Sequence, residues 1–152
     1  MTTGGFVRQR FFYWLLSTVY CLLLFSSCAV EERRDIPAAA QATVERVTED
    51  IAAGHDEKVY LEAAPEWRAQ VSAEENARIL ARVRERLGRV ESRALHKGTE
   101  QQSASPPLSG HALELFYSTR FERGSATERF TLLERGGDWL LAGYTVTSDA
   151  LK

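Results

Sequence analysis

The sequence has few of the residues from which disulfide frameworks and metal centres are built. It contains two cysteines in 152 residues, Cys21 and Cys28, which are too few for a disulfide scaffold. Its three histidines, His55, His96 and His111, are far apart and do not follow metalloprotease spacing. We therefore expect neither a metal site nor a cofactor.

Other absences exclude further classes of function. The formal net charge is -2 at pH 7, and no basic stripe alternates with aromatic residues, so we expect no binding to nucleic acid. The chain lacks a Gly-x-Ser-x-Gly segment, the sharp turn that presents a nucleophilic serine in many hydrolases. After residue 25 no stretch approaches 18 consecutive apolar residues, so the rest of the chain offers no spanning helix.

The N-terminal block has the order of an export signal. Arg8 and Arg10 precede an apolar run over residues 11–25, which Ser26, Ser27 and Cys28 follow. This is a basic region, an apolar core and a small-residue exit. A spanning helix needs about 20 apolar residues, so the run is short for a permanent anchor. We predict a signal peptide over residues 1–27.

The segment Phe25-Ser26-Ser27-Cys28 resembles the lipobox of bacterial lipoproteins. The first lipobox position is usually Leu, and here Phe25 follows three leucines. The resemblance implies a diacylglyceryl group on the Cys28 thiol and cleavage just before it. Two acyl chains make membrane attachment stable where one is marginal. With Ala29 next, the resemblance favours the outer membrane. The alternative is an uncleaved single-pass helix, which an intact-mass measurement would reveal.

Loss of residues 1–27 would leave a mildly acidic chain without a disulfide. Arg8 and Arg10 leave with the signal, so 19 Lys+Arg become 17 against 21 Asp+Glu, and the formal charge moves from -2 to -4. Cys21 leaves too, and Cys28 would be blocked by lipid. The folded body must then be held by packing alone.

The mature chain is predicted to be a tether over residues 28–37, with Glu31–Asp35 solvated, and one domain over residues 38–148. Apolar residues at helical spacing predict helices over 38–53, 56–63 and 73–87, with Ser72 capping the third. Trp67 is expected in a loop or a helical turn. Alternation predicts strands over 90–96, 113–121, 127–134 and 139–146, with a long loop over 97–109. Helices first and strands last indicate an α+β fold, with N-terminal helices packed on a curved antiparallel sheet of about four strands.

Several motifs resemble a bacterial family of exported domains of unknown function. They are Leu87-Gly88-x-Val90-x2-Arg93, Glu128-x-Phe130-Thr131-Leu132 and Trp139-x3-Gly143-Tyr144, preceded by Tyr60-x4-Pro65-Glu66-Trp67-Arg68. The resemblance covers about residues 41 to 147. It implies a cystatin-like, nuclear-transport-factor-2-like fold, a half-cone that hosts isomerases, dehydratases and binding modules. It carries no catalytic residues to this chain, because none is established for the family.

A half-cone can enclose a pocket between sheet and helices. Trp67, Tyr117, Glu128 and Tyr144 are the candidate ligand-binding residues. A glutamate facing an apolar cavity, Glu128 or Glu114, could act as an acid or base. The plainer interpretation, which we favour, is that Glu114, Glu128 and Arg129 form a solvated strand face and that the aromatics are core.

Two classes of function remain. The first is a non-enzymatic, lipid-anchored domain of the cell envelope that binds an envelope protein or a small apolar ligand. The second is a small-pocket enzyme of isomerase or dehydratase type. An enzyme needs a cavity with at least two convergent polar groups, whereas an interaction module would fill that space with Leu and Phe. The open sheet is also a candidate surface for a homodimer.

Overall fold

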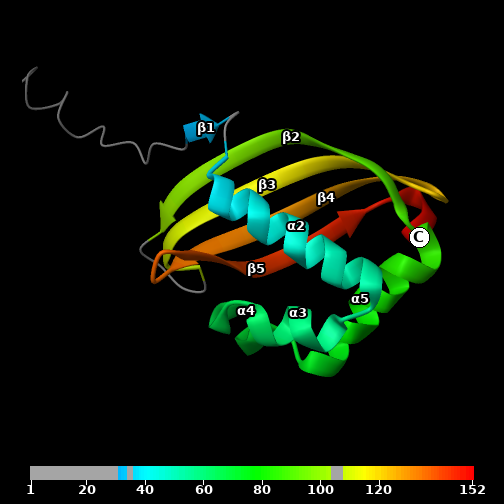
Figure 1. The fold of residues 1–152 in the computed structure, drawn as a ribbon, viewed down its shortest axis with the longest axis horizontal. Helices are drawn as coiled ribbons and strands as arrows, with labels where there is room; N and C mark the ends of the chain where they lie inside the picture. The colour runs from blue at the N-terminus through cyan, green and yellow to red at the C-terminus, as the bar shows by residue number, and fades with distance from the viewer. Residues whose placement is uncertain (1–30, 34–35, 104–107) are drawn as a thin grey trace, which may run out of the picture.

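The computed structural model describes residues 31–33, 36–103 and 108–152 (Figure 1). The predicted signal peptide and Cys28 lie outside these residues. The helices are α2 (Ala38–Ala53), α3 (Asp56–Glu62), α4 (Pro65–Gln70), α5 (Ala73–Leu87) and the short 3-10 helix η1 (Asp149–Leu151). The strands are β1 (Glu31–Arg33), β2 (Val90–Ser103), β3 (Gly110–Phe121), β4 (Gly124–Arg135) and β5 (Asp138–Thr147).

The strands form one antiparallel sheet in the order β1-β2-β3-β4-β5, so each strand pairs with its neighbour in the chain. β2 to β5 make up most of it, and β1 is a short addition at the β2 edge. Gly136 and Gly137, with φ of 63° and 92°, form the β4–β5 turn. Both glycines adopt the left-handed conformation that a two-residue hairpin turn requires. The predicted α+β fold with helices on a curved sheet is confirmed.

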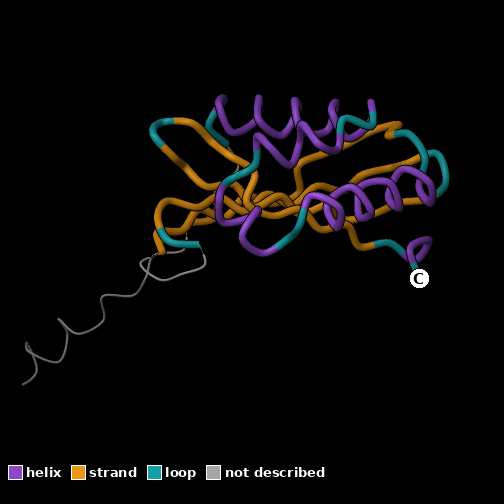
Figure 2. The backbone as a smooth tube through the Cα atoms, turned by 90° about the horizontal axis from the view of Figure 1, so that it is seen from below, coloured by secondary structure: helices purple, strands orange, loops and turns teal. Residues whose placement is uncertain are grey.

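α2 lies across one face of the sheet, which we call the inner face (Figures 1 and 2). The predicted helical stripe is confirmed, since Ala40, Val44, Val47 and Ile51 are all buried. They join one core cluster with inner-face side chains of β3 and β4 such as Leu115. Apolar side chains on facing elements thus bury each other, which is the main stabilising contribution here.

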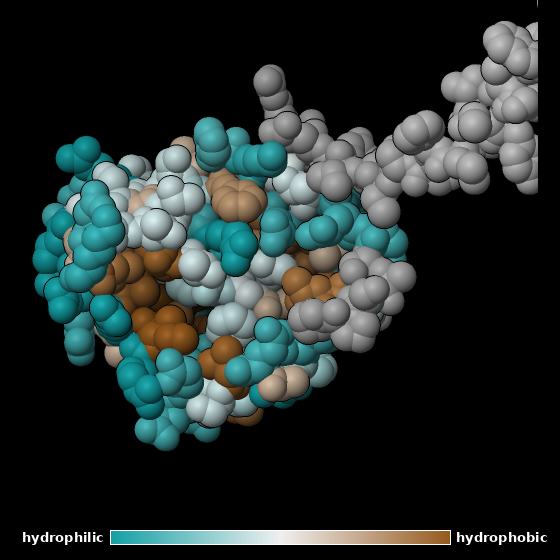
Figure 3. Space-filling model, turned by 180° about the vertical axis from the view of Figure 1, so that it is seen from behind, coloured by the Kyte–Doolittle hydropathy of each residue, from teal (hydrophilic) through white to brown (hydrophobic). Residues whose placement is uncertain are grey.

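α5 begins and ends where the sequence predicts. The Ser72 side chain accepts a hydrogen bond from the Glu75 amide at 3.1 Å, the N-terminal half of the expected capping box. Val83 and Leu87 pack with Phe121 and Ala126 in a second apolar cluster. That cluster lies in the half of the molecule that holds α5 and the C-terminal end. Figure 3 shows that half from behind, with apolar side chains gathered in a hollow.

Two local predictions were wrong. β2 continues to Ser103 instead of ending near residue 96, because backbone pairing with β3 over Gly98–Ser103 needs no apolar alternation. Part of the expected solvated tether is a strand, since Glu31–Arg33 pairs with Gly98–Glu100. Trp67 lies in the short helix α4, which fits the expected helical turn, and Pro65 occupies the first turn of that helix, a position that proline prefers.

Candidate functional site

A pocket of about 210 Å³ lies on the inner face, between the C-terminal ends of α2 and α5 and the start of β2. The turn between β3 and β4 closes its other side. This volume is below the range of about 300–1,000 Å³ typical of sites for drug-sized ligands. The lining residues are Thr48, Ile51, Ala52, Val83, Arg84, Gly88, Arg89, Val90, Arg93, Phe121, Glu122, Arg123, Glu128 and Tyr144.

Glu128 is the buried charge of this pocket, with only 1% of its surface exposed. Its carboxylate accepts hydrogen bonds from Arg93 Nε at 2.6 Å, from the Tyr144 hydroxyl at 2.7 Å, and from the Thr119 hydroxyl. β-sheet register produces this arrangement. Glu128 is two residues before Phe130 on β4, and its partner strand brings Tyr117 and Thr119 to the same inner face.

The network holds Glu128 with both a charge partner and neutral donors, as a buried carboxylate requires. Burial, followed by the neighbouring Glu128 charge, raises the pKa of Tyr144 well above its ordinary value. Tyr144 therefore remains a neutral donor throughout the physiological range. Both oxygens of Glu128 thus accept hydrogen bonds, from three donors in all.

Arg93 is the cation of the network and is partly accessible, with 19% of its side chain exposed. Its guanidinium carbon lies 6.0 Å from the centre of the Phe130 ring, which places it over an apolar surface. Only Nε is engaged, by Glu128. Among the described residues, its two terminal amino groups make no hydrogen bond.

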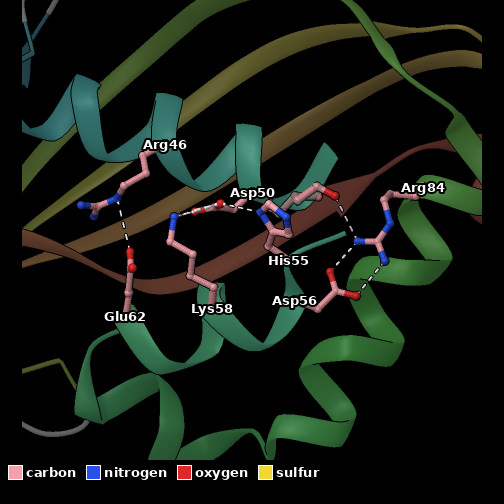
Figure 4. A network of polar contacts seen from close by, with 8 residues as sticks. Arg46, Asp50, His55, Asp56, Lys58, Glu62 and Arg84 are labelled. Carbon is pink, nitrogen blue, oxygen red and sulfur yellow. Dashed lines mark hydrogen bonds and ion pairs between the residues drawn. The ribbon is translucent and has the colours of Figure 1, made fainter. Parts of the chain in front are cut away.

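A second polar network joins the helices around the pocket (Figure 4). Arg84, which lines the pocket, makes a two-point ion pair with Asp56, the second contact at 2.7 Å. Its NH1 group also donates to the Ile51 carbonyl at 3.1 Å. These bonds tie α5 to the start of α3 and the end of α2.

The same network continues along α2 and α3. Asp50 accepts from His55 and Lys58, and these bonds, Lys58 first, lower the pKa of the Asp50 carboxyl. Arg46 pairs with Glu62 at 3.5 Å. The helices bordering the pocket are thus held together by charge pairs as well as by apolar contact.

A wider and shallower hollow of about 530 Å³ lies at the same end of the sheet. Serine and threonine side chains of β2 to β5 form most of its wall, including Ser118, Ser125 and Thr127. It is more open to solvent, and the buried Glu128 does not line it. We therefore assign the candidate site to the smaller pocket.

The structure brings together only two of the four candidate residues from the sequence, Glu128 and Tyr144, in direct contact and lining the pocket. Tyr117 is buried beside the Phe130 ring, 5.7 Å between centroids, and is not in the pocket wall. Trp67 packs against the main core from α4, and its Nε1 donates to Asn76 at 3.3 Å.

The expectation that Glu128 lies on a solvated strand face was wrong. Arg129 does lie on the outer face, is exposed and pairs with Glu114 at 4.0 Å. Glu128 has the opposite parity on β4, so it shares the inner face with Phe130 and Leu132. The spacing of Glu128, Phe130 and Leu132, two residues apart, indicated a shared face. The prediction gave more weight to the charge of Glu128, which favours solvent.

Arg93 and Thr119 were not predicted as site residues. Thr119 follows Tyr117 by two residues on β3 and so shares its face. Arg93 precedes Leu95 by two residues on β2, and the two lie on either side of the exposed Ala94. Period-two alternation could have placed both beside Glu128, although it could not have shown the contacts.

Two kinds of site are not found in the part of the chain that the structure describes. Histidine, cysteine, aspartate and glutamate do not gather there into a group suited to a metal ion. In the same residues, no helix has the length and apolar character needed to cross a bilayer.

A family model described as a protein of unknown function, DUF4019, matches residues 40–144. The chain therefore belongs to the DUF4019 family. Comparison with curated proteins yields no match. The matched region contains the whole Glu128 network, with Arg93 near its middle and Tyr144 at its end.

Proposed function

We propose that this DUF4019 protein is a non-enzymatic binding module of the bacterial cell envelope, and that its ligand enters the pocket beside Glu128. The observation that carries the proposal is the saturated carboxylate network at the wall of a small, partly apolar pocket. Because these charged groups bond to each other, their side chains are already ordered before a ligand enters. Less conformational entropy is then lost on binding, which favours affinity. The resemblance to cystatin-like, nuclear-transport-factor-2-like folds, which include ligand-binding modules, belongs to the same proposal.

Attachment to the envelope would occur through lipid on Cys28, after removal of residues 1–27. The basic start, the short apolar run and the cysteine at its end support this. The segment between Cys28 and α2, part of which pairs with the sheet as β1, would then hold the domain close to the membrane, with the outer membrane favoured by Ala29. The partner in this setting is an envelope protein or a small ligand, and the outer face of the sheet is available for a homodimer.

Metabolic labelling tests the anchor. We expect radiolabelled palmitate to enter the protein, and expect the Cys28→Ser variant to lose both the label and its place in the membrane fraction. Cys21→Ser is the matched control, because that cysteine lies within the predicted signal. An unlabelled protein that retains residues 1–27 by intact mass would replace the lipid anchor with a single-pass helix.

A small-pocket enzyme of isomerase or dehydratase type is the second candidate. The convergence of Glu128, Arg93 and Tyr144 beside a cavity favours it, because such reactions need converging polar groups. Against it, the three hydrogen bonds on Glu128 would have to rearrange before that carboxylate could move a proton.

Crosslinking in intact cells separates binding at the pocket from binding at the outer face of the sheet. A benzophenone amino acid at Val90, which is 41% exposed at the pocket, would capture what lies there. The same group at Thr145, an exposed position on the outer face of β5, is the control. Capture at Val90 alone supports the pocket as the binding surface, and capture at Thr145 alone moves binding to the sheet.

A further inference from the structure

We propose that the ligand is a small organic anion with an apolar body, whose carboxylate is bound by the two terminal amino groups of Arg93. This inference rests on the proposed binding function of the pocket and adds the chemical class of the ligand. It follows from three properties of the site: the hydrogen-bond donors of Arg93 that have no partner among the described residues, the balance of charge in the wall, and the apolar part of the lining.

Arg93 and Arg84 both line the pocket, but they differ in how many of their N–H groups are already hydrogen-bonded. A guanidinium carries five N–H donors. Arg84 uses both terminal nitrogens on Asp56 and the Ile51 carbonyl. Arg93 bonds only through Nε, to Glu128. Glu128 therefore fixes the plane of the Arg93 guanidinium and leaves its terminal pair for a second partner. A planar pair of N–H groups matches a carboxylate at two points.

The charges in the wall favour an anion over a cation. The lining includes the four arginines Arg84, Arg89, Arg93 and Arg123 and two glutamates, Glu122 and Glu128. Both glutamates are occupied on both oxygens, Glu122 by the amide and Nε of Arg89 and Glu128 by its three donors. An entering cation would find no carboxylate oxygen without a donor in this wall. An entering anion would find the Arg93 amino groups.

The apolar part of the lining suits an apolar body of limited size. Ile51 of α2, Val83 of α5 and Phe121 at the end of β3 line the pocket together with Val90. The volume of about 210 Å³ excludes long acyl chains and large ring systems. The fit is to a short-chain or single-ring carboxylic acid with its acid group toward Arg93.

The test uses three probes that share one apolar tail: hexanoate, hexanol and hexylamine. The full chain, reconstituted in lipid nanodiscs, is titrated with each probe while the methyl NMR signals of Ile51, Val83 and Val90 are followed. Empty nanodiscs correct the free probe concentration. We expect hexanoate to bind about tenfold more tightly than hexanol, because a charge-assisted two-point contact is added, and hexylamine to bind most weakly.

The double variant Arg93→Gln/Glu128→Gln removes the terminal amino groups of Arg93 together with its charge pair to Glu128. The two amides that replace them can hydrogen-bond to each other. We expect it to lose the preference for hexanoate. Arg120→Gln, which changes an arginine 72% exposed on the outer face, should keep that preference.

The possible results separate the two proposals. Equal binding of hexanoate and hexanol at the pocket methyls would overturn the anion assignment and leave the binding module standing. Tight hexanoate binding that the double variant does not weaken would also overturn it. No methyl shift with any probe would count against both. If the double variant does not fold, the comparison of the three probes on the unaltered chain still decides.

Discussion

The two ends of the inner face each hold a β4 glutamate beside a cation from another strand, but the cations differ. At the pocket end, Glu128 contacts Arg93 of β2. At the far end, Glu134 contacts His111 of β3, whose other ring nitrogen contacts Glu100. A guanidinium stays charged at every physiological pH, whereas an imidazole changes charge near neutrality. The pocket end thus carries a permanent charge pair, and the far end a titratable one.

Burial differs between the ends as much as the cation does. The side chain of Glu128 is 1% exposed and that of Glu134 is 39% exposed. Loss of the cation therefore leaves Glu128 almost fully desolvated at the pocket end and Glu134 partly hydrated at the far end, although both contacts are short. Exposure, more than distance, decides how strongly each pair is coupled to the fold.

The largest effect is expected at Phe130, in the core beside the pocket end. This side chain is 0% exposed, its ring lies 4.9 Å from that of Tyr144, and Arg93 lies over it. Phe130→Ala should lower the free energy of unfolding by about 3–5 kcal/mol, through lost burial and a cavity. Denaturant unfolding followed by tryptophan fluorescence measures it. Phe116→Ala, at a half-buried outer-face position, should cost clearly less. Equal losses would contradict the idea that burial of the ring beside the Glu128 network sets the size of the effect.

The next effect concerns the charge pair at the pocket end. Arg93→Met should lower the free energy of unfolding by about 3 kcal/mol, because Glu128 would stay buried without its cation. Glu128→Leu added to Arg93→Met should recover most of that loss, since an apolar pair leaves no unpaired charge. A double variant as unstable as the single one would show that packing, and not the orphaned charge, causes the loss.

A smaller effect isolates one neutral donor in the same network. Tyr144→Phe removes the 2.7 Å hydrogen bond to Glu128 and leaves the ring in place. Loss of one of three donors to a buried carboxylate should cost about 1–2 kcal/mol. Tyr60→Phe is the matched control, because the Tyr60 hydroxyl makes only an exposed 3.5 Å contact with the Arg68 carbonyl. Thermal unfolding of both variants should separate them, and two equal, negligible shifts would contradict the role given to Tyr144.

Most of the fold could be predicted from residue spacing. The α2 stripe, the Ser72 cap of α5 and the last three strands depend on neighbours in the sequence, which periodicity detects. The length of β2 could not be predicted, because the polar segment Lys97–Ser103 is held by backbone bonds to β3 that carry no side-chain pattern.

The candidate site was harder to predict for a different reason. Side chains two residues apart on a strand point to the same face, so alternation alone would have put Glu128 on the face of Phe130. A carboxylate is rarely buried unless it is paired, which argued against that placement. Its charged partner, Arg93, is 35 positions earlier in the sequence. The register of two strands that are not adjacent in the sheet brings the two together. A single sequence does not contain that register.

The smallest expected effect belongs to the far end and appears only when pH is varied. Hydrogen bonding to Glu134, assisted by that to Glu100, raises the pKa of His111 above its ordinary value of 6.5. Protonated histidine can donate from both ring nitrogens, one to each glutamate, whereas neutral histidine has a single donor. The contribution to stability is therefore complete below about pH 6.5 and is lost as pH rises through the raised pKa of folded His111.

We accordingly expect the wild-type chain to be more stable than His111→Gln at pH 6, with the difference shrinking toward pH 9. The effect should stay below about 1 kcal/mol, because these side chains are partly hydrated. Thermal unfolding across this pH range measures it, with His96→Gln as the control at an exposed position. The contribution of the Arg93–Glu128 pair to stability should not change over this pH range, since Arg93 keeps its charge throughout. A difference between wild type and His111→Gln that is constant with pH would show that His111 contributes through its edge-on contact with Trp139, 4.9 Å between ring centroids, and not through its charge.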